Sequence, residues 1–467
     1  MEVVPKPKKI VKKGEINIKQ EISCCPELEF TKKAFCRMVR KIYGVRLSFG
    51  TDGILVNYDE TLKKDEYRLE GRNIYASSIE GASYGLSTML QIMEKSDDGF
   101  KVQDTEIFDK PDKDFRGFME DLARVWHDFD NLIGYVDICY LNKIKYLQLH
   151  FSDNQSFTLP LECFPEAATK GRCYTKEEIR YLVEYAHEAN IILIPEFEGI
   201  GHSKELIKNC PEFGNTYDIK NEEQEDKTFD GSEDNIMCIG KEGIFNNIRK
   251  ILQEIADTFK YSPYIHVGCD EAKIDNWKNC SCCMDYMKRQ QIKDVKNLYS
   301  HFVQKIVDIC LSLGRTPIVW EGFPYEGTDK ISKDAIVVSW ESYYQTAPEL
   351  LSSGFKIINA SWKPLYIVPP QHTQCLWSIP GADWNVYNWQ HFAKASKAYN
   401  PINVEPQDNV LGGMLCQWEC SLTEEKDRVI YNMPALSDRC WNTEDFLNEE
   451  DYEKSSKKLL SMAQKLI

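Results

Sequence analysis

The sequence predicts an α/β protein, a (β/α)8 TIM barrel that follows a smaller N-terminal α/β domain. Three observations support this fold class: eight strand-like apolar runs after residue 110, helical patterns between many of them, and polar or aromatic side chains where most runs end. Alternating strands and helices imply parallel pairing, and eight such units close a barrel. The runs are Phe115–Leu122, Ile144–Phe151, Ile191–Phe197, Tyr264–Asp270, Thr316–Glu321, Ala335–Trp340, Lys356–Ala360 and Val410–Trp418.

Residues 1–110 form the predicted N-terminal domain, residues 111–446 the barrel, and residues 447–467 a C-terminal helix packed on it. The N-terminal part gathers no acids, histidines or aromatic residues into a site, so we expect it to be a scaffold. Its predicted elements are a basic leader at Lys8–Lys13, helices at Thr31–Tyr43 and Ile79–Met93, and strands at Gly53–Asn57 and Glu66–Leu69.

The composition restricts the possible partners. The chain has 467 residues and a formal net charge of −16, which argues against nucleic acid or an anionic membrane as the main partner. No stretch has the length of a membrane span, and the first residues lack the apolar core of a signal peptide, so we expect a cytoplasmic protein with reduced thiols. The densest thiol group is Cys280, Cys282 and Cys283; no Cys/His pair at finger-like spacing follows it, so the sequence favours no metal site there.

Polar and aromatic residues follow the predicted strands, where a barrel keeps its functional groups. The polar residues are Asp121, Arg124, His150, Asp153, Glu196, Glu198, His202, Asp270 and Glu271. The aromatic residues are Trp320, Trp340, Trp362, Tyr366 and Trp418. Indoles around one mouth form a wall of the kind that stacks on a sugar ring, and carboxylates beside such a wall indicate glycoside hydrolysis.

The run Tyr264–Glu271 reads Tyr-Ile-His-Val-Gly-Cys-Asp-Glu. With a period of two, one face is apolar and the other polar, and the acids come only at its C-terminal end. This pattern suits a barrel strand that opens into a pocket. On this stretch alone, the alternative that Asp270 and Glu271 simply begin a solvated loop stays open.

Five motifs occur in order: Arg116-Gly-Phe-Met-Glu-Asp-Leu-Ala-Arg124, His150-Phe-Ser-Asp153-Asn-Gln-Ser-Phe157, Ile194-Pro-Glu-Phe-Glu-Gly-Ile-Gly-His202-Ser203, His266-Val-Gly-Cys-Asp-Glu271 and Gly412-Gly-Met-Leu-Cys-Gln-Trp418. In these motifs the chain resembles the glycoside hydrolase family 20 β-N-acetylhexosaminidases. The resemblance implies an exo-acting retaining enzyme that removes terminal β-linked GlcNAc or GalNAc without a metal or organic cofactor. It also implies substrate-assisted catalysis, in which the sugar's 2-acetamido group is the nucleophile.

The resemblance assigns roles to four catalytic residues. Asp270 would accept the acetamide N–H and stabilise the oxazolinium-like intermediate, and Glu271 would be the general acid and then the general base. Asp153 and His202 match the Asp–His pair that touches the acid.

The resemblance also implies a set of substrate-binding residues. Arg116 looks like the arginine that holds the sugar hydroxyls at O3 and O4, and the tryptophans 320, 340 and 418 would line the acetamide pocket and the floor of the sugar site. Two positions depart from the family pattern. Glu419 follows Trp418 directly, whereas the family usually has a glycine between the two residues. The family tyrosine that hydrogen-bonds the acetamide carbonyl usually comes right after the tryptophan; here Tyr366 comes four residues after Trp362 and would take its place.

Three alternatives remain from the sequence. A metal-dependent hydrolase would use His150, Asp153, His202, His266 and Asp270 as ligands. A carbohydrate-binding barrel without turnover needs the aromatic wall but no tuned acid. A transglycosylase would use the same residues as the hydrolase, and neither the GlcNAc or GalNAc preference nor the oligomeric state follows from the sequence.

Overall fold

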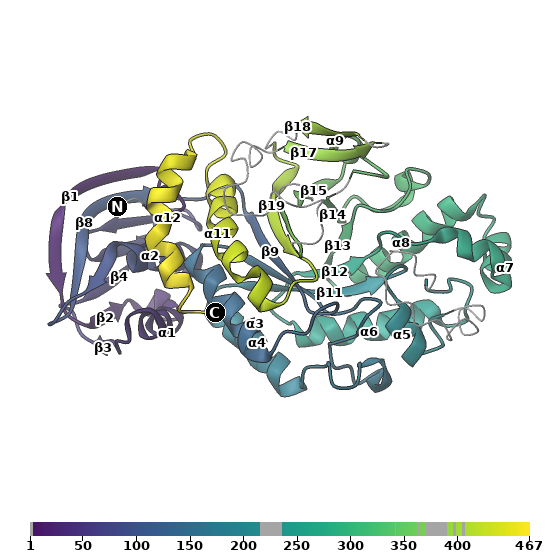
Figure 1. The fold of residues 1–467 in the computed structure, drawn as a ribbon, viewed down its shortest axis with the longest axis horizontal. Coiled ribbons are helices and arrows are strands. Elements are labelled where there is room, and N and C mark those ends of the chain that lie inside the picture. Colours follow the sequence, from purple (N-terminus) through teal and green to yellow (C-terminus); the bar gives the residue numbers. More distant parts are fainter. Residues whose placement is uncertain are drawn as a thin grey trace.

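The computed structural model describes residues 3–214, 236–340, 342–361, 365–369, 390–395, 398–403 and 407–467. All eight predicted strand runs are strands, and they pair in parallel into a closed barrel, which confirms the predicted fold class (Figure 1). In barrel order the strands are β9 (Phe115–Asp121), β10 (Tyr146–His150), β11 (Ile192–Gly199), β12 (Tyr264–Gly268), β13 (Thr316–Trp320), β14 (Ile336–Ser339), β15 (Lys356–Asn359) and β19 (Val410–Gln417).

Helices surround the barrel and connect its strands. They are α3 (Phe129–Leu141), α4 (Lys176–Glu188), α6 (Ile244–Thr258), α8 (Val295–Ser312), α9 (Ala347–Ser352) and α11 (Leu422–Trp441). The loops after β11 and β12 are long and hold α5 (Lys204–Asn209), η4 (Ile274–Asn279) and α7 (Ser281–Arg289). A short strand, β16 (Tyr366–Ile367), pairs with β19, and β17 (Gln390–Ala395) pairs with β18 (Ala398–Asn403). No helix in the described ranges is long and apolar enough to cross a membrane.

The N-terminal domain is a sheet with two helices. In sheet order its strands are β1 (Lys9–Ile18), β8 (Phe100–Asp109), β5 (Tyr67–Glu70), β6 (Asn73–Ala76), β4 (Ile54–Tyr58), β2 (Glu21–Cys24) and β3 (Ser48–Phe49), with β7 (Met93–Lys95) also paired to β8. The helices are α1 (Thr31–Tyr43) and α2 (Ile79–Ile92). The sequence interpretation of Lys8–Lys13 as a leader was wrong, because nearly all of these residues belong to the edge strand β1, whose side chains are mostly exposed.

The C-terminal helix α12 (Glu449–Ala463) lies between the N-terminal domain and the barrel (Figure 1). Lys458 Nζ donates to the backbone oxygen of Met93, 2.8 Å away, and Lys465 Nζ donates to that of Ile42 at 2.9 Å. The helix also contacts α3 and α11 of the barrel. It therefore joins the N-terminal domain to the barrel.

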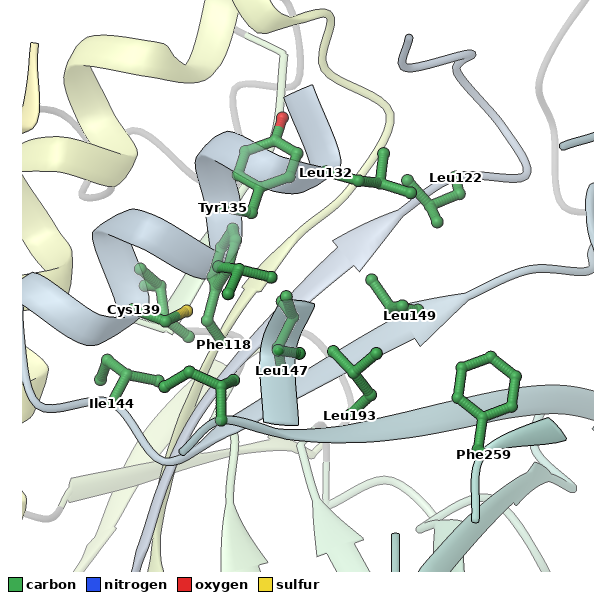
Figure 2. Close-up of a cluster of buried hydrophobic side chains, with 14 of the residues drawn as sticks. Phe118, Leu122, Leu132, Tyr135, Cys139, Ile144, Leu147, Leu149, Leu193 and Phe259 are labelled. Carbon is green, nitrogen blue, oxygen red and sulfur yellow. The ribbon is translucent and has the colours of Figure 1, made fainter. Parts of the chain in front are cut away.

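Apolar side chains on the outer face of the barrel form the core against its helices. Phe118 and Leu147, on neighbouring strands, lie near Tyr135 and Cys139 of α3, and Leu193 on β11 lies beside Leu147 (Figure 2). Leu147 is fully buried, and truncation of such a leucine to alanine costs about 2–5 kcal/mol. This packing fixes the strands whose ends carry the polar residues described next.

Candidate active site

The polar and aromatic residues that follow the strands gather at the C-terminal mouth of the barrel, where such folds hold their reacting groups. Ring and charge contacts link the groups after β10, β11 and β12 to one another and to Trp418 after β19. The described part of the site therefore draws on strands that are far apart in the sequence.

Asp270 and Glu271 differ sharply in exposure although they are consecutive. The Asp270 side chain is 12% exposed, and the Glu271 side chain is 50% exposed. Two glycines press on Asp270: a Cβ on Gly322 would lie 2.5 Å from Asp270 Cβ, and one on Gly201 would lie 2.5 Å from the Asp270 carbonyl oxygen. Asp270 Oδ1 is buried and has no hydrogen-bond partner among the described residues. The pair is thus a buried carboxyl beside an accessible one.

His202 lies between these acids and Asp153. Its Nε2 is 3.5 Å from Glu271 Oε2 and 3.8 Å from Asp270 Oδ2, and its Nδ1 is 3.2 Å from Asp153 Oδ1. On the other side of Asp153, Arg124 Nη2 lies 2.8 Å from Oδ2. A continuous chain of charge-assisted contacts therefore runs from Arg124 to Glu271.

This chain of contacts sets the protonation of its members. Burial favours the neutral form of Asp153, but the charges of Arg124 and His202 prevail and hold the pKa of Asp153 well below its usual range. Burial likewise disfavours the His202 cation, yet Asp153 and the two acids raise the pKa of His202 well above its usual value. Burial raises the pKa of Asp270 to about 7, with His202 opposing it. The cation of His202 thus sits against a carboxyl that titrates near neutrality.

A second polar network forms the floor of the mouth around Glu196. Its carboxylate accepts hydrogen bonds from Trp320 Nε1 at 2.6 Å and Gln148 Nε2 at 2.8 Å, and lies 3.0 Å from His150 Nδ1 and 3.1 Å from His266 Nδ1. The two histidines left out of the predicted catalytic set therefore lie in this buried network. It fixes the orientation of the Trp320 indole.

Aromatic rings form one continuous surface above this floor. Trp340 and Tyr366 are parallel with centroids 5.9 Å apart, and the ring of Trp418 lies 5.9 Å from Tyr366 and 5.7 Å from Trp320. Trp340 Nε1 donates to the Glu321 carbonyl oxygen, 2.5 Å away. The structure thus brings together four of the five predicted aromatic residues. The fifth, Trp362, lies outside the described residues.

Glu419 and Arg124 lie next to each other at the edge of this surface. Glu419 Oε1 is 3.8 Å from Arg124 Nε, and the Arg124 guanidinium lies over the Trp418 ring, 4.8 Å from its centroid. The Glu419 backbone N–H donates to Asp121 Oδ2 at 3.2 Å. The predicted binding residue Glu419 is therefore at the mouth despite its changed spacing from Trp418.

The prediction that Arg116 binds the sugar was wrong. Arg116 is the second residue of β9, at the opposite end of the barrel, and its guanidinium is fully buried. It donates to the carbonyl oxygens of Lys113 and Lys143 and to the Tyr84 hydroxyl of the N-terminal domain. Arg124 ends the same motif eight residues later, beyond the C-terminal end of β9 at Asp121. The position of each arginine relative to the strand end could have distinguished them.

Unusual backbone conformations concentrate at this mouth. Of the nine non-glycine residues with positive φ in the described chain, six lie just beyond barrel strands: Ile200 (85°), His202 (49°), Cys269 (74°), Glu271 (47°), Ser342 (55°) and Glu419 (61°). Each such conformation costs of the order of 1–3 kcal/mol and persists only where the surroundings impose it. The side chains of His202 and Glu271 are therefore aimed by strained backbone.

Comparisons with known proteins agree with this arrangement. The model of "Glycosyl hydrolase family 20, catalytic domain" matches residues 114–444. The β-hexosaminidase of Vibrio furnissii is 26% identical over 411 residues, covering 82% of this chain and 65% of its own. That of Porphyromonas gingivalis is 28% identical over 302 residues, covering 60% of this chain and 38% of its own. The chain therefore spans between about one third and two thirds of the length of these relatives.

A solved structure shares the fold. The family 20 exo-β-N-acetylglucosaminidase of Vibrio harveyi, determined in complex with N-acetylglucosamine, superposes with a TM-score of 0.81 at 22% identity over 99% of this chain and 77% of that one. At this identity the likeness shows the fold alone. The family model covers most of the sequence and includes all five motifs that carry the resemblance, so the chain belongs to glycosyl hydrolase family 20.

Proposed function

We propose that this chain is an exo-acting retaining β-N-acetylhexosaminidase that uses the substrate's 2-acetamido group as its nucleophile. The observation that carries this proposal is the buried Asp270 carboxyl, whose Oδ1 has no partner among the described residues, one position before the accessible Glu271. A buried carboxylate oxygen is stabilised by a donor such as an amide N–H. The names of the Vibrio relatives support the same substrate class.

The spacing of the acids supports acetamide participation. Ligand atoms of His202, Asp270 and Glu271 all lie within 4.8 Å of one another. An inverting enzyme needs its two carboxyl groups about 6.5–9.5 Å apart, and a retaining enzyme with an enzymic nucleophile needs them on opposite sides of the anomeric carbon. Burial and the neighbouring carboxyls raise the pKa of Glu198 well above the usual value, which disfavours the anion that a nucleophile needs.

The proposed reaction then has two steps. In the first, the acetamide carbonyl oxygen attacks C1, the glycosidic bond breaks, and Glu271 gives its proton to the departing oxygen. Asp270 accepts the acetamide N–H as positive charge develops on that nitrogen, which stabilises the oxazolinium-like intermediate. In the second, water attacks C1, Glu271 takes the proton from the water, and the acetamide is restored, so the anomeric configuration is retained.

The contacts behind the acids support the double role of Glu271. The cation of His202, held by Asp153 and Arg124, lies 3.5 Å from Glu271 and favours its ionised form after the proton has left. The exposed side of Glu271 remains open to the leaving group and water. We propose Asp153 and Arg124 as positioning residues that act through His202.

The aromatic surface and Glu419 would hold the sugar. Trp320, Trp340, Tyr366 and Trp418 provide flat apolar faces for the pyranose ring and the acetamide methyl group. Glu419, beside Arg124, is the polar group that would meet ring hydroxyls, including the O4 that distinguishes GlcNAc from GalNAc.

The test compares substrates and variants together. Wild type should release the aglycone from aryl β-glycosides of GlcNAc or GalNAc and not from that of glucose, which lacks the acetamide. Glu271→Gln should lose about 10²–10⁴-fold on a disaccharide but far less on an activated aryl glycoside, because a good leaving group needs little acid assistance. Asp270→Asn should lose a similar factor on both.

The matched control is Asp275→Asn, an acid in the same loop whose side chain is 79% exposed. It should behave as wild type. Equal cleavage of the glucoside would refute acetamide participation and favour a metal-dependent or two-carboxylate hydrolase. Tight sugar binding without turnover of any substrate would favour a binding barrel.

A further inference from the structure

Three cysteine thiols meet beside the mouth of the barrel, outside the residues that the proposed reaction uses. Cys238 comes from the loop after β11, and Cys280 and Cys283 flank the start of α7 in the loop after β12. Cys238 Sγ lies 3.4 Å from Cys283 Sγ and 3.6 Å from Cys280 Sγ, and all three sulfurs lie within 4.8 Å of one another. All three residues are buried.

These distances have a specific chemical meaning. A disulfide holds its two sulfurs about 2.05 Å apart and leaves a third thiol outside the bond. A zinc ion bound by thiolates at about 2.3 Å, with tetrahedral angles, holds each pair of sulfurs about 3.8 Å apart. The observed separations lie close to the edges of such a tetrahedron and far from a disulfide. The three sulfurs therefore form a triangle of similar separations and not one bonded pair with a third thiol apart.

Backbone N–H groups point at the sulfurs as they do where thiols are ionised. Cys280 receives the N–H groups of residues 282 and 283, at the first turn of α7, and Cys238 receives that of Gly240. A Cβ on Gly240 would lie 2.0 Å from the Cys282 carbonyl oxygen, so only glycine allows this close approach. The two loops are therefore shaped around the sulfurs, and N–H donors offset the negative charge that metal-bound thiolates carry.

We propose that Cys238, Cys280 and Cys283 bind one Zn²⁺ through their thiolate sulfurs as a structural site. In the described chain no further histidine, cysteine or carboxylate joins the group. Thiolates are soft ligands and favour zinc over magnesium, calcium or manganese. The sequence alone disfavoured this site because no second Cys/His pair follows Cys283. The third ligand, Cys238, lies 42 positions before Cys280, outside the spacing of zinc-finger motifs.

The site would tie together the two loops that carry the proposed catalytic groups. Met237, next to Cys238, donates its N–H to the Ile200 carbonyl oxygen at 2.9 Å, two residues before His202. Trp277 Nε1 in η4 donates to the Met237 carbonyl oxygen at 2.9 Å. Zinc would thus hold the loop of His202 against the loop of Glu271 from outside the pocket, without touching substrate.

The experiment measures metal content directly and does not depend on activity. The full chain, kept reduced, is equilibrated with excess Zn²⁺, freed of loose metal by gel filtration and analysed by elemental mass spectrometry. We expect one zinc per chain in wild type and at least a tenfold loss in Cys238→Ser and Cys283→Ser. The matched control is Cys282→Ser, because Cys282 lies in the same turn with an exposed side chain; it should keep one zinc per chain.

A second measurement covers the case in which a variant fails to fold. Wild type titrated with Co²⁺ should develop thiolate-to-cobalt charge-transfer absorption and the intense visible bands of tetrahedral cobalt, both removed by added Zn²⁺. Wild type that binds neither metal would overturn the proposal, as would a Cys282→Ser variant that loses zinc to the same extent as Cys238→Ser. Two thiols missing from a titration of the unfolded, unreduced chain would overturn it in favour of a disulfide.

Discussion

Replacement of Asp270 by asparagine should lower the activity about 10²–10⁴-fold and, at neutral pH, make the protein more stable. In the folded chain burial raises the pKa of Asp270 to about 7, against an ordinary value of 3.8. This difference of about three pH units, at about 1.4 kcal/mol each, corresponds to about 4 kcal/mol. A carboxyl with a raised pKa contributes its full stability below pH 3.8 and loses it as the pH rises through 7. Asparagine has no such loss.

The amide has a cost of its own. The asparagine amide at position 270 is buried without a full set of hydrogen-bond partners, which costs about 1–3 kcal/mol at every pH. At pH 4 the variant should therefore be equal to or less stable than wild type. Between pH 4 and pH 8 the difference in unfolding free energy should move in favour of the variant by about 4 kcal/mol, which makes the variant the more stable protein above pH 7.

The assay is urea unfolding of both proteins, followed by tryptophan fluorescence at several pH values from 4 to 8. Titrating groups away from Asp270 contribute equally to both proteins and cancel from the difference, whereas the pKa values of His202 and Glu198 depend on the Asp270 charge and contribute to it. Asp275→Asn, with its exposed side chain, should give a difference that is flat with pH. A difference for Asp270→Asn that is also flat, or that moves against the variant as the pH rises, would refute the assignment of Asp270 as a carboxyl destabilised by its burial.

Three further predictions test other parts of the site. Arg124→Lys should lower kcat/KM by about 10–100-fold at nearly unchanged unfolding temperature, since lysine keeps the charge but cannot reproduce the guanidinium contacts at the mouth. Arg116→Lys should leave kcat/KM normal but lower the unfolding free energy by about 3 kcal/mol or more, because several buried acceptors lose their donors. Asp153→Asn should cost about 3–5 kcal/mol at pH 7, because it removes the buried carboxylate that offsets the charges of both Arg124 and His202. The depressed pKa of Asp153 stabilises the protein above about pH 4, and the raised pKa of His202 stabilises it below about pH 6.5, so the wild-type advantage over Asp153→Asn should shrink towards both extremes of a pH series of unfolding curves. Glu419→Gln should change the ratio of GlcNAc to GalNAc turnover more than it changes turnover of the better substrate, measured with paired aryl glycosides.

The barrel could be predicted from sequence because its strands are buried on both faces. Each strand then appears as an apolar run bounded by polar residues, and all eight runs are strands in the structure. The edge strand β1 could not be recognised in this way. Only Ile10, Ile16 and Ile18 are partly or fully buried, and the exposed stretch between Ile10 and Ile16 interrupts the alternation, so the lysines resemble an unstructured leader.

From the sequence, the site residues could be predicted only by their position just after the C-terminal ends of the strands. Asp270, Glu271 and His202 follow strands directly, and the structure brings them together as that position requires. Arg116 and Arg124 begin and end one motif, and the resemblance assigned sugar binding to Arg116 although only Arg124 lies beyond the C-terminal end of the strand. Cys238 was missed for a different reason: its partners are distant in sequence, and only the folded loops bring the thiols together.

The mouth of the barrel buries several carboxyl groups, and burying a charge lowers the stability of the folded protein. The mouth buries Asp153, Glu196 and Glu198, and of these only Glu198 has a raised pKa, because the others are held ionised by histidine and arginine. Asp270 lies between these two cases: His202 opposes its burial but does not overcome it. Its Oδ1 has no hydrogen-bond partner among the described residues, and an arriving acetamide N–H would supply that donor. Binding of the proposed substrate would therefore relieve a carboxyl that its burial destabilises, which suits Asp270 to recognise an N-acetyl sugar.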